Sequence, residues 1–191
     1  TDSVSATVVT PLTITVSAPP NLVNTSEIVD SGLIFNLDFA NSASFNRVTR
    51  AASDISGSKK TVTLNNNPVF SEENLGYLKM TAANSQYITA TGFSTMSKWS
   101  IDTFFRLDST SQYTCIVTGE ATTSNATRNI GLCIDATSAR IYAGFHNGTY
   151  WTYVRTQEQI PVNTWTHVVA QWDGLTSAAQ TSVKIWINGV Q

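Results

Sequence analysis

The chain has 191 residues, of which only 13% are charged, and its formal net charge is −2 at pH 7. This charge provides no basic footprint, which argues against a nucleic-acid partner, and no run of about 18 apolar residues is present to insert into a membrane. The length predicts one domain of about 150–160 residues, large enough to bury a core, plus an extra segment. The abundance of Thr, Ser and Asn is typical of an all-β protein with many turns.

The extra segment is N-terminal. Residues 1–18 alternate apolar and polar side chains on both sides of Pro11, and Pro19-Pro20 then interrupts the pattern. Proline suits an edge strand or a bulge, because it donates no ladder hydrogen bond. We therefore interpret residues 1–18 as a strand of a preceding immunoglobulin-like domain or as an arm exchanged onto a neighbour's sheet edge, with residues 19–31 as a linker.

From Gly32 onward the pattern predicts a succession of short strands separated by turns. Residues 40–60 are polar and predict a long loop, and Asn147-Gly148 predicts a tight hairpin turn. No segment of useful length has the period of a helix. The predicted strands are residues 32–39, 61–64, 78–80, 87–90, 99–107, 112–119, 130–136, 139–146, 149–156, 165–172 and 183–188.

The segment 165–190 is the most regularly patterned part of the chain. Its two strands alternate in character with a period of two, and Asn188-Gly189 suits a turn with positive φ. We interpret the segment as an antiparallel hairpin with a bulky apolar face that the rest of the chain covers. Trp165 and Trp186 are expected to anchor the core or its rim.

Two cysteines, Cys115 and Cys133, lie in predicted strands on either side of the polar loop 123–129. Antiparallel pairing about this loop sets them opposite each other, which leaves a disulfide open as an alternative. Cross-strand geometry usually strains such a bond, so we interpret the pair as two buried free thiols. Two cysteines without a Cys/His cluster do not make a zinc site.

Several motifs occur in an order that resembles one known superfamily. They are GLIFNLDF (32–39), NPVFSEENLGYLKMTAANSQYITA (67–90), WSIDTFFRLDS (99–109), IPVNTWTHV (160–168), and WTHVVAQWDG followed by VKIWINGV (165–190). Together they resemble the laminin-G-like, concanavalin A-like lectin and glucanase jelly-roll superfamily, of the kind found in tailed-phage structural proteins. The resemblance implies an all-β, antiparallel two-sheet β-sandwich over residues 32–191. It also implies further C-terminal strands, one of them beside the opening strand, so we expect additional sequence or another chain to complete the sandwich.

The same resemblance extends to glycan hydrolases, which need two carboxylates close together. The laminarinase-like motif E-[ILV]-D-x-x-E is absent, and Glu72-Glu73 are neighbours in a predicted loop. His167 occupies the W-T-H position of the family, and we interpret its imidazole as a half-buried strand residue. We therefore expect no enzymatic activity, with an unusual glycoside hydrolase as the less favoured alternative.

Some relatives bind calcium through Asp and Asn side chains at loop ends. Asp38, Asp135 and Asp173 lie at predicted strand ends, and their oxygens suit a hard cation. They do not resolve into a recognisable ligand set, so we interpret them as turn residues and expect no cofactor. Calcium binding is the alternative.

Aromatic residues crowd the predicted hairpin turn at 147–148. Aromatic rings stack on sugar faces and asparagine supplies hydrogen bonds, so this hairpin is the candidate glycan site. In the alternative interpretation, two of its rings alternate into the core or cover the sheet. The candidate residues are His146, Asn147, Tyr150, Trp151 and Tyr153.

These observations predict a non-catalytic adhesion or display module of a larger virion-surface or extracellular protein. Its expected partners are other chains or domains of an assembly and a host surface glycan. The alternative is a purely structural virion module that contacts other subunits and never a sugar.

Overall fold

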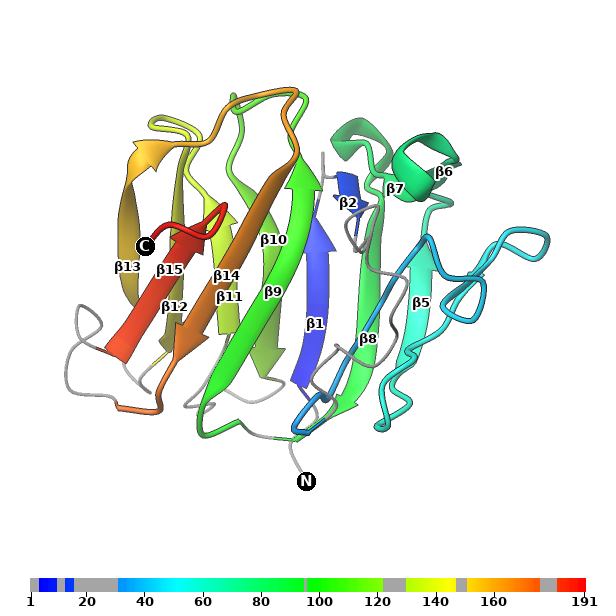
Figure 1. The fold of residues 1–191 in the computed structure, drawn as a ribbon, viewed down its shortest axis with the longest axis horizontal. Coiled ribbons are helices and arrows are strands. Elements are labelled where there is room, and N and C mark those ends of the chain that lie inside the picture. The colour runs from blue at the N-terminus through cyan, green and yellow to red at the C-terminus, as the bar shows by residue number, and fades with distance from the viewer. Residues whose placement is uncertain are drawn as a thin grey trace.

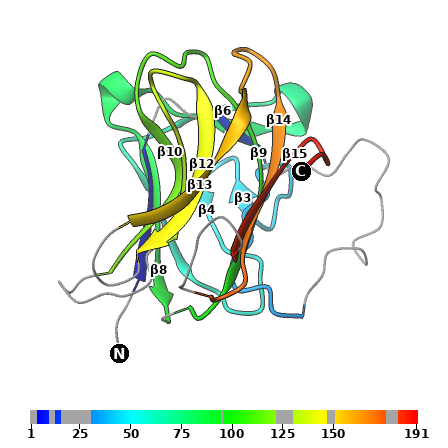
Figure 2. The ribbon, with the colours of Figure 1, turned by 90° about the vertical axis from the view of Figure 1, so that its left-hand side faces the viewer.

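The computed structural model describes residues 4–9, 13–15, 31–94, 96–121, 130–146, 151–175 and 182–191. A seven-stranded and a six-stranded antiparallel sheet pack face to face as a β-sandwich, which Figure 1 shows from the front and Figure 2 shows after a turn of 90°. This architecture confirms the predicted fold class. Two short 3₁₀ turns occur among the described residues, and no helix there is long and apolar enough to cross a membrane.

The larger sheet has the spatial order β13-β12-β11-β10-β1-β8-β5. In that order its strands are Trp151–Gln159, Arg140–His146, Ile130–Ile134, Thr114–Ala121, Val4–Val9, Tyr87–Phe93 and Thr61–Asn65. The smaller sheet has the order β15-β14-β9-β2-β7-β6. Its strands are Val183–Ile187, Thr166–Trp172, Trp99–Arg106, Thr13–Thr15, Tyr77–Lys79 and Val69–Ser71. The minor elements are β3 (Phe45–Asn46), β4 (Ala51–Ala52), η1 (Glu73–Leu75) and η2 (Ala82–Asn84).

The core lies between the sheets and follows from the alternation along each strand. In β12, Ile141, Ala143 and Phe145 are fully buried, and the residues between them face the other way. Trp172 of the opposite sheet stacks on Phe145 with ring centroids 4.4 Å apart. Both sheets therefore contribute bulky side chains to one continuous core.

The C-terminal hairpin forms as predicted, with β14 paired to β15 and positive φ angles at residues 188–189. Its buried face differs from the expectation. The β14 side chains that point into the core are Thr166, Val168, Ala170 and Trp172. Trp165 and Trp186 are instead half-buried on the outer face of the smaller sheet. The large side chains of Trp172 and Phe145 occupy this part of the core, so the other inward positions of β14 hold smaller residues.

The N-terminal segment also differs from the expectation of a separate preceding domain. Residues 4–9 form β1 between β8 and β10, and residues 13–15 form β2 between β7 and β9 (Figure 1). Both strands lie in the interior of their sheets, because each is hydrogen-bonded to a neighbouring strand on both sides. The segment is therefore part of this sandwich.

The predicted opening strand, residues 32–39, is not a strand in the structure. Its apolar side chains still reach the core, with Phe39 only 1% exposed. Side chains satisfy its backbone in place of a sheet ladder, because Asn36 N–H donates to Asp54 and Asp38 N–H donates to Ser44, both at 2.9 Å. The following segment, predicted as a loop, contains the short β3–β4 hairpin.

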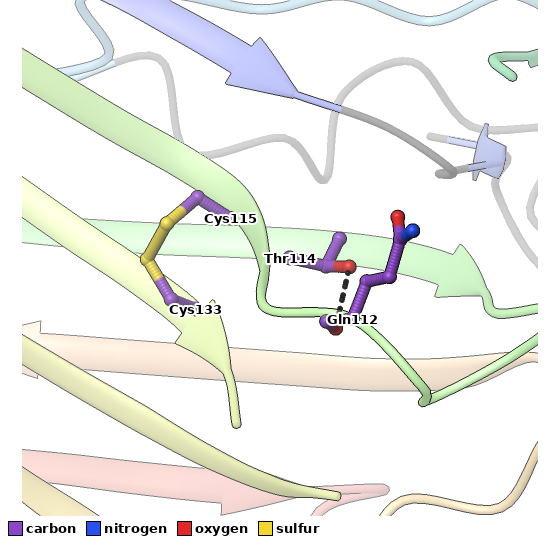
Figure 3. The surroundings of a disulfide bond; sticks show 4 residues. All are labelled: Gln112, Thr114, Cys115 and Cys133. Carbon is purple, nitrogen blue, oxygen red and sulfur yellow. Dashed lines mark hydrogen bonds between the residues drawn. A yellow bond between two sulfur atoms is a disulfide. The ribbon is translucent and has the colours of Figure 1, made fainter. Parts of the chain in front are cut away.

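The free-thiol interpretation of the cysteines is wrong. Cys115 of β10 and Cys133 of β11 lie directly opposite each other and form a disulfide (Figure 3). A register shift between Cys115 and Val117 interrupts the ladder at this point. The Cα atoms are only 3.9 Å apart, so the two side chains meet without a long reach across the pair.

Candidate functional site

The outer face of the larger sheet carries a row of exposed aromatic rings at its β10–β13 end. Tyr142 of β12 alternates with core residues and therefore points outward. Its ring centroid is 5.7 Å from that of Tyr113, just before β10, and 5.4 Å from that of Tyr153 on β13. Tyr113 and Tyr153 are 56% and 51% exposed. We call these three residues, together with Trp151, the aromatic strip.

Trp151 belongs to the strip because one glycine makes room for its indole, and a second glycine lets the backbone of its strand approach closely. Gly131 of β11 and Gly144 of β12 are cross-strand neighbours on the outer face. A Cβ at Gly131 would lie 2.5 Å from the Cζ2 atom of Trp151, so the indole rests directly on this bare backbone. A Cβ at Gly144 would lie 2.2 Å from the Thr152 carbonyl oxygen. Glycine inside a strand commonly marks such a close approach.

The disulfide lies next to the strip. Cys133 is the cross-strand partner of Tyr142 on one side and of Cys115 on the other. The bond links β10 to β11 (Figure 3), and Cys133 stands next to Tyr142 in the register of β11 and β12. It stiffens the base from which Tyr113 and Tyr142 project.

The cationic side chain of Arg155 lies next to the strip in the register of β12 and β13. Arg155 is the cross-strand partner of Tyr142, and its Nη1 atom is 3.7 Å from Asp135 Oδ2. The backbone N–H of Thr137 and the hydroxyl of Ser138 donate to Asp135, and these hydrogen bonds lower the pKa of its carboxyl group. The Asp135 carboxylate is thus fixed by hydrogen bonds within its own turn. The Arg155 guanidinium, which has five N–H donors, contacts Asp135 through its Nη1 atom and can donate its other hydrogen bonds at the edge of the strip.

The structure brings together only part of the predicted glycan site. Trp151 and Tyr153 lie on the outer face, so they do not alternate into the core, and the other half of the alternative, that they cover the sheet, agrees with the indole of Trp151 lying over Gly131. Asn147 and Tyr150 lie outside the described residues, as does the side chain of His146. Tyr113 and Tyr142 were not predicted, because Tyr113 is far from this hairpin in sequence and Tyr142, on the first strand of the hairpin, lies outside the crowded residues at its turn. The available signal in the sequence was a glycine inside each of two neighbouring predicted strands, Gly131 and Gly144, because such glycines mark a close approach of other groups to the sheet.

The three calcium candidates act separately as turn residues. Asp38 accepts a hydrogen bond from Ala40 N–H and Asp173 accepts one from Leu175 N–H, each at 2.9 Å. Burial raises the pKa of the Asp38 carboxyl group in spite of its hydrogen bonds from the backbone. In the described part of the chain, no group of three His, Cys, Asp or Glu side chains forms a metal site.

His167 lies on the other sheet, away from the strip. Its Nε2 atom is 2.8 Å from Asp102 Oδ1, and its ring stacks on Phe104 with centroids 4.3 Å apart. Its side chain is 29% exposed, which agrees with the interpretation as a half-buried strand residue. The contact of His167 with Asp102 was not predicted from the sequence, because it depends on the pairing of β9 with β14.

The fold and the site together define a class of protein. Two antiparallel sheets packed face to face are consistent with a concanavalin A-like β-sandwich. The family model of the concanavalin A-like lectin/glucanases superfamily matches residues 81–191, and the chain belongs to that superfamily. A search of the curated proteins and a search of the solved structures found no match. At the level of the family, the chain is a lectin-like or adhesion module.

Proposed function

We propose that the chain is a non-catalytic glycan-binding module and that the aromatic strip is its binding surface. The observation that carries this proposal is the contiguous row of Tyr113, Tyr142 and Tyr153 beside the flat indole of Trp151. Tyrosine and tryptophan rings offer apolar area with a polar edge and little conformational entropy to lose. These properties suit the face of a sugar ring, which is apolar above and hydroxylated at its rim.

The strip suits an extended saccharide. Its rings come from β13, from β12 and from Tyr113 just before β10, so they follow the direction across the sheet. Arg155 stands at the side of this row and offers hydrogen-bond donors to ring hydroxyls. A chain of sugars lying across β12 and β13 would contact several rings at once.

Catalysis is not part of the proposal. A glycosidase needs an acid and a base or nucleophile on either side of the scissile bond. Asp135, the carboxylate that contacts the strip through Arg155, is hydrogen-bonded within its own turn. We expect no release of reducing ends from β-glucans, galactans or bacterial surface polysaccharide. Turnover that one Asp or Glu substitution abolishes would make the module an enzyme.

The setting proposed for the module is a virion-surface or extracellular protein. The disulfide supports an oxidising location, because such bonds persist mainly outside the cytosol. Sparse charge and abundant Thr, Ser and Asn fit a display module in a larger assembly. A protein of this kind meets host glycans at its outer surface.

A glycan array followed by calorimetry with the best ligand tests the binding surface. Tyr142→Ala combined with Tyr153→Ala should weaken binding at least about tenfold, since each ring pair contributes on the order of 1 kcal/mol beyond area burial. Tyr87→Ala is the matched control, because Tyr87 lies on β8 of the same sheet, far along the strand order from the strip. An array without binding would favour the purely structural module. Equal losses in the control would place the binding surface elsewhere.

A further inference from the structure

The N-terminal arm, residues 4–15, joins both sheets of the sandwich. β1 pairs with β8 and β10 in the larger sheet, and β2 pairs with β7 and β9 in the smaller one. Figure 1 shows both blue strands in the middle of the molecule, with the rest of the chain on either side. The arm thus contributes interior strands although it precedes every other element.

Without the arm, each sheet has a gap next to buried core. In the larger sheet the gap runs along Ile88 and Ala90 of β8, which are 4% and 2% exposed. In the smaller sheet it runs along Leu78 of β7 and Phe105 of β9, both fully buried. Open backbone edges beside apolar side chains are strong templates for another strand.

The strand directions make these gaps specific. β8 and β10 both run antiparallel to β1, so they run parallel to each other. The same holds for β7 and β9 on the two sides of β2. A strand that fills either gap must run opposite to the two strands that flank it if every pair is to be antiparallel. The two gaps together therefore accept one segment that provides a strand to each sheet.

We propose that the arm is transferable and that the arm of a second copy of this chain fills the same two gaps. The backbone partners are the same whether the arm comes from its own chain or from another, which makes the exchange inexpensive. Residues 16–30 connect Thr15 to Ser31, and this length reaches at most about 55 Å when extended. Because the arm is covalently attached to its own gaps, it meets them at a fixed effective concentration, whereas the arm of another copy competes only in proportion to the concentration of the chain. The chain's own arm prevails in dilute solution, and exchange prevails where copies are crowded in an assembly.

A complementation experiment on the full chain tests this proposal. Ala6 lies opposite Gly119 on one side and Ala90 on the other, so Ala6→Pro disturbs the interior strand. We expect this variant to melt at lower temperature than the parent chain. A synthetic peptide of residues 1–18 should bind the variant one to one and raise its melting temperature, whereas the same peptide carrying Ala6→Pro should do neither. The intact chain should take up the native peptide at least about tenfold more weakly, because its own arm competes.

Three results would overturn the proposal. A variant that melts like the parent chain would show that the arm is not an interior strand. A destabilised variant that the native peptide neither binds nor stabilises at mM concentration would show that the arm is not transferable. Refolding the parent chain at about 1 mM should in addition yield dimers that persist on dilution, and monomers alone under these conditions would contradict exchange between copies.

Discussion

Removal of the disulfide should lower stability by an amount that the structure allows us to work out. The bond joins residues 18 apart in sequence, and a loop of this size restricts the unfolded chain by about 3 kcal/mol. For a domain of this length, each kcal/mol corresponds to about 2–4 °C in melting temperature. We therefore expect Cys115→Ala with Cys133→Ala to melt about 6–12 °C below the oxidised parent chain.

Calorimetric or circular-dichroism melts with and without reductant measure this effect. Reductant should lower the melting temperature of the parent chain and leave the double variant unchanged, which separates loss of the bond from general effects of the reagent. Glycan binding should weaken in the double variant, because Tyr142 projects from the strand next to the bond. A double variant that melts within about 2 °C of the oxidised parent would refute the reasoning on loop closure.

Three further perturbations test other parts of the structure. Trp172→Ala should cost about 3–5 kcal/mol in urea denaturation because the indole is fully buried, whereas Trp186→Ala on the outer face should cost on the order of 1 kcal/mol. Gly131→Val should displace the indole of Trp151 and weaken glycan binding at least about threefold, with a far-ultraviolet spectrum like that of the parent. Asp54→Asn should cost about 1–3 kcal/mol at pH 7, because its carboxylate accepts several hydrogen bonds in a buried loop. That cost should shrink as the pH falls below about 4.

The pH dependence follows from the direction of the Asp54 shift. Burial alone would raise the pKa of this carboxyl group, but hydrogen bonds from Lys60, Asn36 and Ser56 outweigh burial and lower it. A lowered pKa in the folded state adds stability above the unfolded pKa and loses it as the pH falls through the folded value. Denaturation of parent and variant at several pH values measures the difference. A constant gap down to the acid limit would contradict the ionised role of Asp54.

Each of the other two perturbations has its own contradicting result. Equal costs for the two tryptophan variants would mean that the hairpin faces are assigned wrongly. For Gly131→Val, unchanged glycan affinity would mean that the indole does not contribute from its place over β11. Gly57→Val is the matched control, since an added Cβ meets nothing within 4 Å there.

Much of the fold was determined by local sequence. The period of two placed the strands from β8 to β15 within a few residues, because alternation needs only the local chain. Asn188-Gly189 predicted its turn because these residues tolerate positive φ. The motifs of the superfamily predicted the sandwich for the same reason, since they are short and continuous.

Other features depended on contacts between distant residues. Alternation defines two faces of a strand but not which of them is inside, so only the stacking of Trp172 on Phe145 decided the orientation of β14. The pairing of Cys115 with Cys133 depended on the register between β10 and β11. The place of β1 depended on a gap between strands that lie more than 80 residues further along the chain.

The aromatic strip shows the same division. Trp151 and Tyr153 are close in sequence, and their local crowding identified them as candidates. Tyr113 and Tyr142 join them only because β10 to β13 lie side by side, which places their rings 5.7 and 5.4 Å apart in one row. A binding surface assembled across strands has no signature along a single strand, because neighbours in a sheet are set by hydrogen-bonded register and not by sequence distance.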